Sequence, residues 1–121
     1  MRVMEESVMN GYSFAWGADV SEKGFAFREG LAILPEDAST IDVKGKDNTQ
    51  FNDAGADKVS NAFEVPVKQL DVDQEMRQEQ FDNWQTTDDH GMQVTGIVED
   101  QNGDKYYLVK NSWGTKHNEL D

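Results

Sequence analysis

The chain has 121 residues, which is at most one domain, and it is strongly acidic, with 24 Asp and Glu against 11 Lys and Arg and a net charge of −13. This charge argues against a nucleic-acid partner, which needs a basic surface, and against binding to an anionic membrane. No apolar run approaches the ~20 residues that cross a bilayer. The chain has no cysteine, so it contains no disulfide, thiolate nucleophile or thiolate-bound zinc.

The first segments predict a helix followed by a strand. Residues 2–9, "RVMEESVM", suit a short helix that Asn10-Gly11 would end. Residues 12–17 alternate aromatic with small side chains, a period of two that predicts a strand with Asp19 at its mouth.

A long stretch with scattered apolar residues follows. Residues 21–64 are rich in Gly, Asp, Asn, Ser and Lys, and neither helical nor strand periodicity persists in them. We interpret the region from about 26 to 70 as a mostly irregular surface insertion. Hydrophobic residues make up only 36% of the chain, and this much loop in a short chain indicates a piece of a larger enzyme.

Residues 71–85, "DVDQEMRQEQFDNWQ", predict a second helix that Asp71 or Asp73 would cap. Two stripes at helical spacing are expected to pack rather than to bind a ligand. They consist of Met76, Gln80 and Trp84, and of Arg77 and Phe81.

The last third of the chain predicts an antiparallel hairpin. Two alternating runs, residues 92–98 and 105–111, flank Asn102-Gly103, a strong hairpin turn signal. A turn centred there would place residue 94 opposite about residue 111. His90 would then lie close to Asn111.

These residues resemble the second half of a papain-like cysteine peptidase. The matching elements are His90-Gly91-Met92, Gly96 and the run Lys-Asn-Ser-Trp-Gly-Thr at 110–115. "GYSFAWGADVSEKGF" and "TTDDHGM" resemble the bleomycin hydrolase/aminopeptidase C branch, so the likeness covers roughly residues 10–25 and 84–115. The family's Cys-bearing helix, its oxyanion-hole Gln and its Gly-Tyr-containing closing strand are absent, as if the chain were clipped at both ends.

The resemblance implies an incomplete α+β fold, the antiparallel barrel-like half of the papain architecture with edge helices. It implies that His90 is the general base of a Cys-His-Asn site, that Asn111 orients its ring, and that Trp113 shields their hydrogen bond from water. It implies peptide bond hydrolysis by an aminopeptidase, with no cofactor and no metal.

The expected partners are a peptide substrate and the missing N-terminal, Cys-bearing half of the same protein. The surface that this half should cover is expected to drive formation of a homo-oligomer. A cytoplasmic location is the working expectation, and the periplasm or secretion stay open because the true N-terminus is not visible.

Simpler roles stay open for several residues. Asp19 lines the substrate cleft by resemblance, or it is a turn residue. Trp113 is equally compatible with a core aromatic. Asp88 and Asp89 suggest a metal ligand only weakly, because neighbouring strand residues point to opposite faces.

Four further residues carry lesser expectations. His117 lies in a polar tail and is expected to be exposed. Gly91 and Gly96 are expected to permit a close approach of backbone or ring. Ser112 is not a candidate nucleophile, because no base is arranged for it.

Two interpretations of the whole chain follow. In the first, it is a fragment of a cysteine peptidase that is inactive alone because the nucleophile is absent. In the second, it is a naturally Cys-less, non-catalytic homologue that binds peptides. The presence of both His90 and Asn111 weighs against the second.

Overall fold

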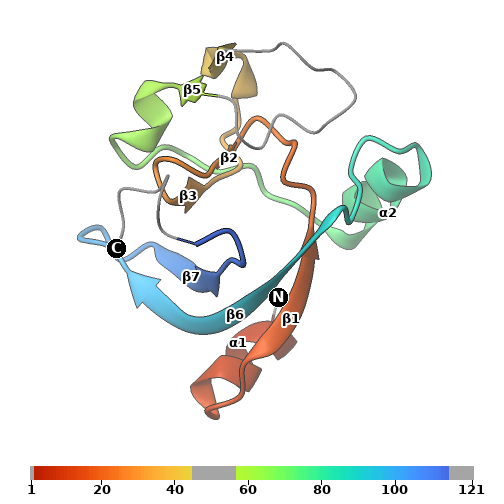
Figure 1. Ribbon diagram of the computed structural model, residues 1–121, viewed down its shortest axis with the longest axis vertical. Coiled ribbons are helices and arrows are strands. Elements are labelled where there is room, and N and C mark those ends of the chain that lie inside the picture. The colour runs from red at the N-terminus through yellow and green to blue at the C-terminus, as the bar shows by residue number, and fades with distance from the viewer. Residues whose placement is uncertain (1, 45–56, 115–121) are drawn as a thin grey trace. The chain divides into compact units, whose positions relative to one another are not determined.

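The computed structural model describes residues 2–44 and 57–114, which divide into two compact units (Figure 1). The first unit comprises α1 (Arg2–Met9), β1 (Phe14–Ala18), β6 (His90–Glu99) and β7 (Lys105–Lys110). The second comprises β2 (Phe25–Ala26), β3 (Leu31–Ala32), the 3-10 helix η1 (Ala38–Thr40), β4 (Asp42–Lys44), β5 (Asp57–Val59), the 3-10 helix η3 (Asn61–Phe63) and α2 (Gln74–Asp82). No helix in the described part is long and apolar enough to span a bilayer.

Helix α1 occupies the predicted residues and ends as the Asn-Gly signal indicated. The Gly11 amide donates to the carbonyl of Val8 at 2.9 Å, and the Tyr12 amide donates to that of Ser7 at 3.0 Å. Gly11 has a φ of 85°, the left-handed conformation that this helix ending requires. The two hydrogen bonds satisfy carbonyls that the last turn would otherwise leave unpaired.

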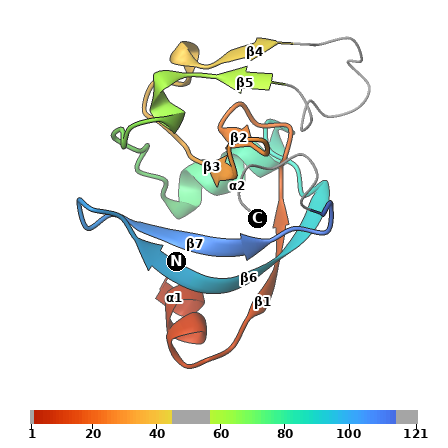
Figure 2. The same cartoon turned by 60° about the vertical axis from the view of Figure 1, so that its left-hand side comes forward.

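The first unit contains an antiparallel sheet with the strand order β1-β6-β7, and its long curved β6–β7 hairpin is clear in Figure 2. Strand β1 pairs with β6 from Phe14 opposite Val94 to Ala18 opposite His90. Ala18, Met92 and Val94 are buried. Burial of side chains the size of Met92 and Val94 contributes roughly 1.5–3 kcal/mol each, which fixes the face that β6 turns inward.

The hairpin turn forms at the predicted place but with a different centre. The Gly103 amide donates to the Asp100 carbonyl at 3.1 Å, and the Asp100 amide donates to the Asp104 carbonyl at 2.9 Å. Gln101 and Asn102 therefore occupy the centre of the turn, and Gly103 follows with a φ of 86°. A three-residue loop of this kind places a left-handed glycine after a turn, rather than at its centre.

This turn corrects the predicted register. Ile97 lies opposite Tyr107, one position from the expected pairing, and a β-bulge between Val94 and Gly96 adds a second shift. Val94 consequently faces Val109, so the expectation that residue 94 faces about residue 111 was wrong. The bulge lies in β6, which has one more residue than β7 at this point of the pairing.

The second unit holds short elements in the region predicted to be irregular. Strands β2 and β3 pair with each other, as do β4 and β5. Val20, Ala26, Ile41 and Ala62 are buried in this unit. Lys58 is also buried, with 4% of its surface exposed, and its ammonium donates to two backbone carbonyls. The segment from 45 to 56 lies outside the described residues.

Helix α2 begins where Asp73 caps it, since the Asp73 carboxylate accepts from the Met76 amide at 2.8 Å. The expectation that its side chains pack was wrong. No residue of α2 is buried, and Phe81 and the following Trp84 are 59% and 83% exposed. Periodicity identified the helix correctly, but its two stripes contain too few aliphatic residues to be buried.

The structure confirms the predicted fold class. The elements are α+β with antiparallel sheets, as expected for an incomplete papain-like fold. None of the sheets in the described part closes into a barrel.

Candidate functional site

The β6–β7 hairpin brings His90 and Asn111 together. His90 is the first residue of β6, and Asn111 directly follows β7. The distance from His90 Nε2 to Asn111 Oδ1 is 2.7 Å, a well-formed hydrogen bond between half-buried side chains. Residues separated by 21 positions in sequence therefore meet because the hairpin folds one strand back onto the other.

The backbone around Asn111 decides which partner donates. The Ser112 amide also donates to Asn111 Oδ1, at 2.7 Å. An N–H needs an acceptor, so this contact identifies the atom as the carboxamide oxygen, which only accepts. His90 Nε2 must then carry a hydrogen. In a neutral ring with that tautomer, Nδ1 has a free lone pair, and no hydrogen bond to it occurs among the described residues.

Trp113 lies against the His90 ring. The two ring centroids are 4.4 Å apart, and the ring planes are tilted by 36°. The hairpin makes this contact possible, because His90 begins β6 and Trp113 lies three positions after the end of β7. The indole packs against one face of the imidazole, and Trp113 remains 38% exposed.

The carboxamide nitrogen of Asn111 is a second notable atom. Nδ2 is buried and has no hydrogen-bond partner in the described part of the chain. A buried unsatisfied donor is uncommon, and it costs about 1–3 kcal/mol. Because two donors hold the carboxamide oxygen in place, the carboxamide cannot rotate to bring its nitrogen to another acceptor.

Asp19 accepts four hydrogen bonds within the second unit. Its Oδ1 accepts from the amide and hydroxyl of Ser21, at 3.0 and 2.5 Å. Its Oδ2 accepts from the amide and hydroxyl of Thr87, at 2.9 and 3.2 Å. Burial alone would raise the pKa of Asp19, but the hydrogen bonds from Ser21 and Thr87 hold that pKa below its ordinary value of 3.8. These contacts favour the turn role, and the substrate-cleft role stays a prediction.

The remaining candidates have less defined surroundings. An added Cβ at Gly91 would meet nothing within 4 Å, and one at Gly96 would make only ordinary contact with Leu108. Neither glycine therefore permits an unusually close approach among the described residues. His117 lies outside them. No group of three Asp, Glu or His side chains with metal-binding geometry occurs in residues 2–44 and 57–114.

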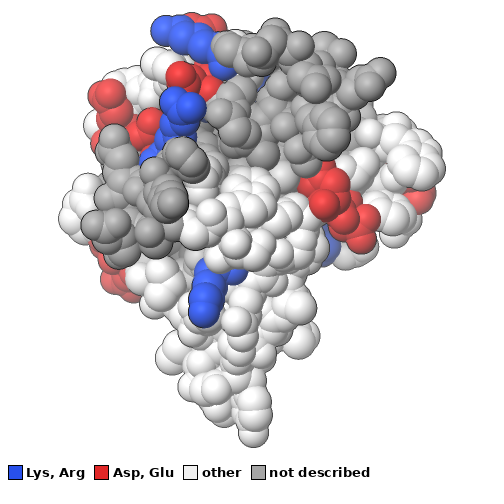
Figure 3. Space-filling view, in the orientation of Figure 1, with Lys and Arg blue, Asp and Glu red and all other residues white. Residues whose placement is uncertain are grey.

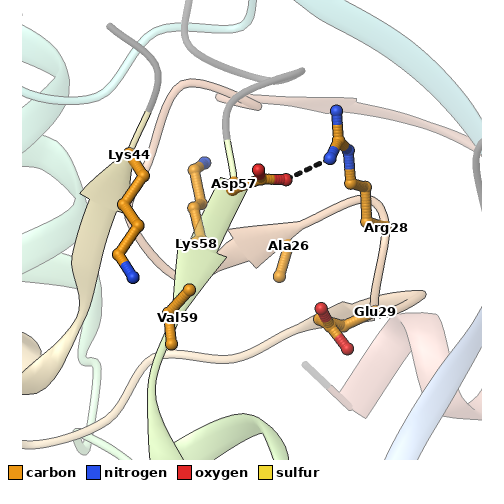
Figure 4. A pocket seen from close by; sticks show the side chains of 7 residues that line it. All are labelled: Ala26, Arg28, Glu29, Lys44, Asp57, Lys58 and Val59. Carbon is orange, nitrogen blue, oxygen red and sulfur yellow. Dashed lines mark ion pairs between the residues drawn. The ribbon is translucent and has the colours of Figure 1, made fainter.

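The second unit has a hollow of about 260 Å³, which the sequence analysis did not predict (Figure 4). It is lined by Ala26, Arg28, Glu29, Lys44, Asp57, Lys58 and Val59. Arg28 forms an ion pair with Asp57, and the Lys58 ammonium points away to the carbonyls of Glu22 and Phe25. On the face shown in Figure 3, basic side chains lie in small separate groups. The charged side chains that line the hollow are thus of both signs, and most of them are already paired. None of them forms a pair suited to proton transfer.

Three polar contacts of the structure were not predicted from the sequence. The Ser112 amide fixes the Asn111 oxygen, and Thr87 holds the Asp19 carboxylate. Lys58 was passed over because a lone lysine within a polar stretch gives no periodic signal. Only the Asn-Ser dipeptide could have indicated the first contact, since its geometry is local.

Comparison with known proteins assigns the chain to a family. The model of the papain family cysteine proteases matches residues 33–120, which is well over half of the chain. His90, Asn111 and Trp113 all lie within the matched residues, whereas β1 and Asp19 precede them. No curated protein matches the chain. The chain belongs to the papain family of cysteine proteases.

Proposed function

We propose that this chain supplies the general base and its orienting carboxamide to a Cys-His-Asn peptidase site. The observation that carries the proposal is the 2.7 Å contact between His90 Nε2 and Asn111 Oδ1, with Trp113 against the imidazole. The chain has no cysteine, so the nucleophile belongs to a polypeptide segment outside this sequence.

The geometry suits proton transfer at one defined atom. With Nε2–H donating to Asn111, the lone pair on His90 Nδ1 can take the proton of a thiol. The resulting thiolate attacks the carbonyl carbon of a peptide bond. The imidazolium then protonates the departing amine, a thioester remains on the sulfur, and water hydrolyses it with His90 again acting as base.

Asn111 contributes orientation without charge. A neutral carboxamide fixes the ring but does not compete with the thiolate for the imidazolium. The Ser112 amide holds the carboxamide oxygen in advance, so little reorganisation is needed when the proton moves. Trp113 limits the access of water to this hydrogen bond, which strengthens it.

We further propose that the whole enzyme is an aminopeptidase of the bleomycin hydrolase/aminopeptidase C type, and that this chain alone is inactive. The likeness of residues 11–25 and 86–92 to that branch supports the first statement. The absence of any thiol supports the second, because neither His90 nor Asn111 forms the acyl intermediate.

Reconstitution tests the proposal. The genomic reading frame around the chain is searched for a Cys-bearing helix, and that segment is co-expressed with this chain. The pair is expected to cleave a fluorogenic amide of an amino acid with a free α-amine, but not its N-acetylated form. Cleavage of the N-blocked substrate at a comparable rate contradicts the aminopeptidase assignment.

Two histidine variants provide the matched comparison. His90→Ala is expected to lower kcat/KM by about 10²- to 10⁴-fold, the range for loss of a general base. His117→Ala, the same change at the chain's only other histidine, is expected to leave activity unchanged. Turnover by the purified chain without a partner segment would falsify its predicted inactivity.

A further inference from the structure

Two segments that adjoin the first sheet are joined by side-chain hydrogen bonds. Asp19 directly follows β1, and Thr87 lies three positions before the first residue of β6. The Asp19 carboxylate accepts from both the amide and the hydroxyl of Thr87. A second bond joins the same segments, because Thr86 Oγ1 donates to Glu22 Oε1 at 3.1 Å.

These bonds begin where the strand pairing ends. Ala18 opposite His90 is the last pair between β1 and β6. The ends of a strand ladder open more readily than its middle, and side-chain hydrogen bonds beyond the last pair oppose this opening. The Asp19 carboxylate takes the Thr87 amide in this position. It is itself held by the Ser21 amide, so the acceptor is fixed before Thr87 reaches it.

We propose that Asp19 is a positioning residue for His90. Its carboxylate anchors Thr87, and this anchor keeps the start of β6 in the register that directs the imidazole to Asn111. This inference rests on the proposed function, because it assigns a structural support to the same base. Asp19 touches neither ring nor substrate in this role, and it acts through three residues of backbone.

The chemistry of the carboxylate is suited to this task. Each oxygen receives two donors, one oxygen from Ser21 and the other from Thr87. An asparagine has a single acceptor oxygen, so it can serve one of these residues but not both. Asp19→Asn therefore sets an NH2 group against the donors of either Ser21 or Thr87, which weakens the link between the segments with almost no change in side-chain volume.

The chain contains a matched control for this substitution. Asp37 accepts from the Ser39 amide at 2.9 Å and the Ser39 hydroxyl at 2.5 Å, which repeats the contact of Asp19 with Ser21. Within residues 2–44 and 57–114, no hydrogen bond joins the Asp37 carboxylate to the segment before β6. Asp37→Asn therefore makes the same change beside an equivalent serine turn but leaves the anchoring of Thr87 intact.

The readout is the solvent exchange of the His90 Nε2 hydrogen, followed by NMR of the chain labelled with ¹⁵N-histidine, with buried backbone amides of β6 as an internal reference. Asp19→Asn is expected to accelerate this exchange by about tenfold or more relative to the reference amides, as expected for loss of a hydrogen bond to a charged group. Asp37→Asn is expected to change it by less than about twofold. A role confined to overall stability would accelerate both kinds of hydrogen together.

Each outcome decides the question. Equal effects of the two variants, or no effect of Asp19→Asn, overturn the positioning role while the His90–Asn111 pair stands. Absence of a protected Nε2 hydrogen in the unaltered chain overturns the pair as well. If circular dichroism finds Asp19→Asn unfolded, Thr87→Val and Thr87→Ser replace it, because serine keeps the hydroxyl donor and valine does not. Faster exchange in the valine variant alone supports the proposal, and equal exchange in both refutes it.

Discussion

Replacing Asn111 with alanine removes an acceptor that two donors share. His90 Nε2 and the Ser112 amide both donate to Asn111 Oδ1 at 2.7 Å. A typical hydrogen bond contributes about 0.5–1.5 kcal/mol net, so loss of both lowers the free energy of unfolding by about 1–3 kcal/mol, and removal of the buried, unpaired Nδ2 offsets part of this loss. In the same step the imidazole loses the contact that selects its tautomer and orientation.

Urea unfolding monitored by circular dichroism measures the first effect, and histidine NMR measures the second. For a chain of this size the expected loss moves the urea midpoint by roughly 1 M. The His90 Nε2 hydrogen is expected to lose its protection from exchange. In the reconstituted enzyme, kcat/KM is expected to fall by roughly 10- to 100-fold, because only orientation is lost.

Asn102→Ala is the matched control, the same substitution in the exposed turn of the same hairpin. It is expected to change stability by less than about 0.5 kcal/mol. If Asn111→Ala leaves the His90 hydrogen as protected as it is in the unaltered chain, the carboxamide does not orient the ring, and the proposed division of roles is wrong.

Three further outcomes are expected. Gly24→Ala should destabilise by roughly 1–3 kcal/mol, since a Cβ there would overlap the Ile33 carbonyl oxygen, whereas Gly91→Ala meets no atom within 4 Å; chemical unfolding distinguishes them. Lys58→Met should cost roughly 2–5 kcal/mol in the same assay, because it leaves two backbone carbonyls without their donor. Asp19 has a lowered folded-state pKa, so its contribution is present above its ordinary value of 3.8 and is lost as the pH falls through the folded value. The stability difference between the chain and Asp19→Asn should therefore narrow below about pH 3.8, and a constant difference across acid titration would contradict this.

Local signals predicted the first unit well. The Asn-Gly ending of α1, the aromatic alternation of β1 and the hairpin around Asn102 each concern contacts between near neighbours in sequence. Such contacts follow from backbone preference and short-range pairing, which a single sequence displays. The family motif then indicated which side chains the hairpin should bring together, and the structure places His90 and Asn111 in contact.

The strand register and the burial of side chains were harder to predict from the sequence. The position of the turn centre depends on whether Gly103 lies within or after the turn, and both arrangements suit an Asn-Gly pair. The bulge beside Gly96 and the exposure of Phe81 depend on neighbours far away in sequence. Periodicity shows that a face is apolar, but not whether another element exists to cover it.

The hairpin has a kinetic consequence. His90 and Asn111 are brought together by one turn and its flanking strands, so their contact closes a short loop of chain. Hairpins form on a timescale of about 1–10 μs, far faster than pairings between distant segments. His90 and Asn111 can therefore come together as one local event during folding. In the proposed site, the thiol, which this chain lacks, would join an imidazole already aligned to receive its proton.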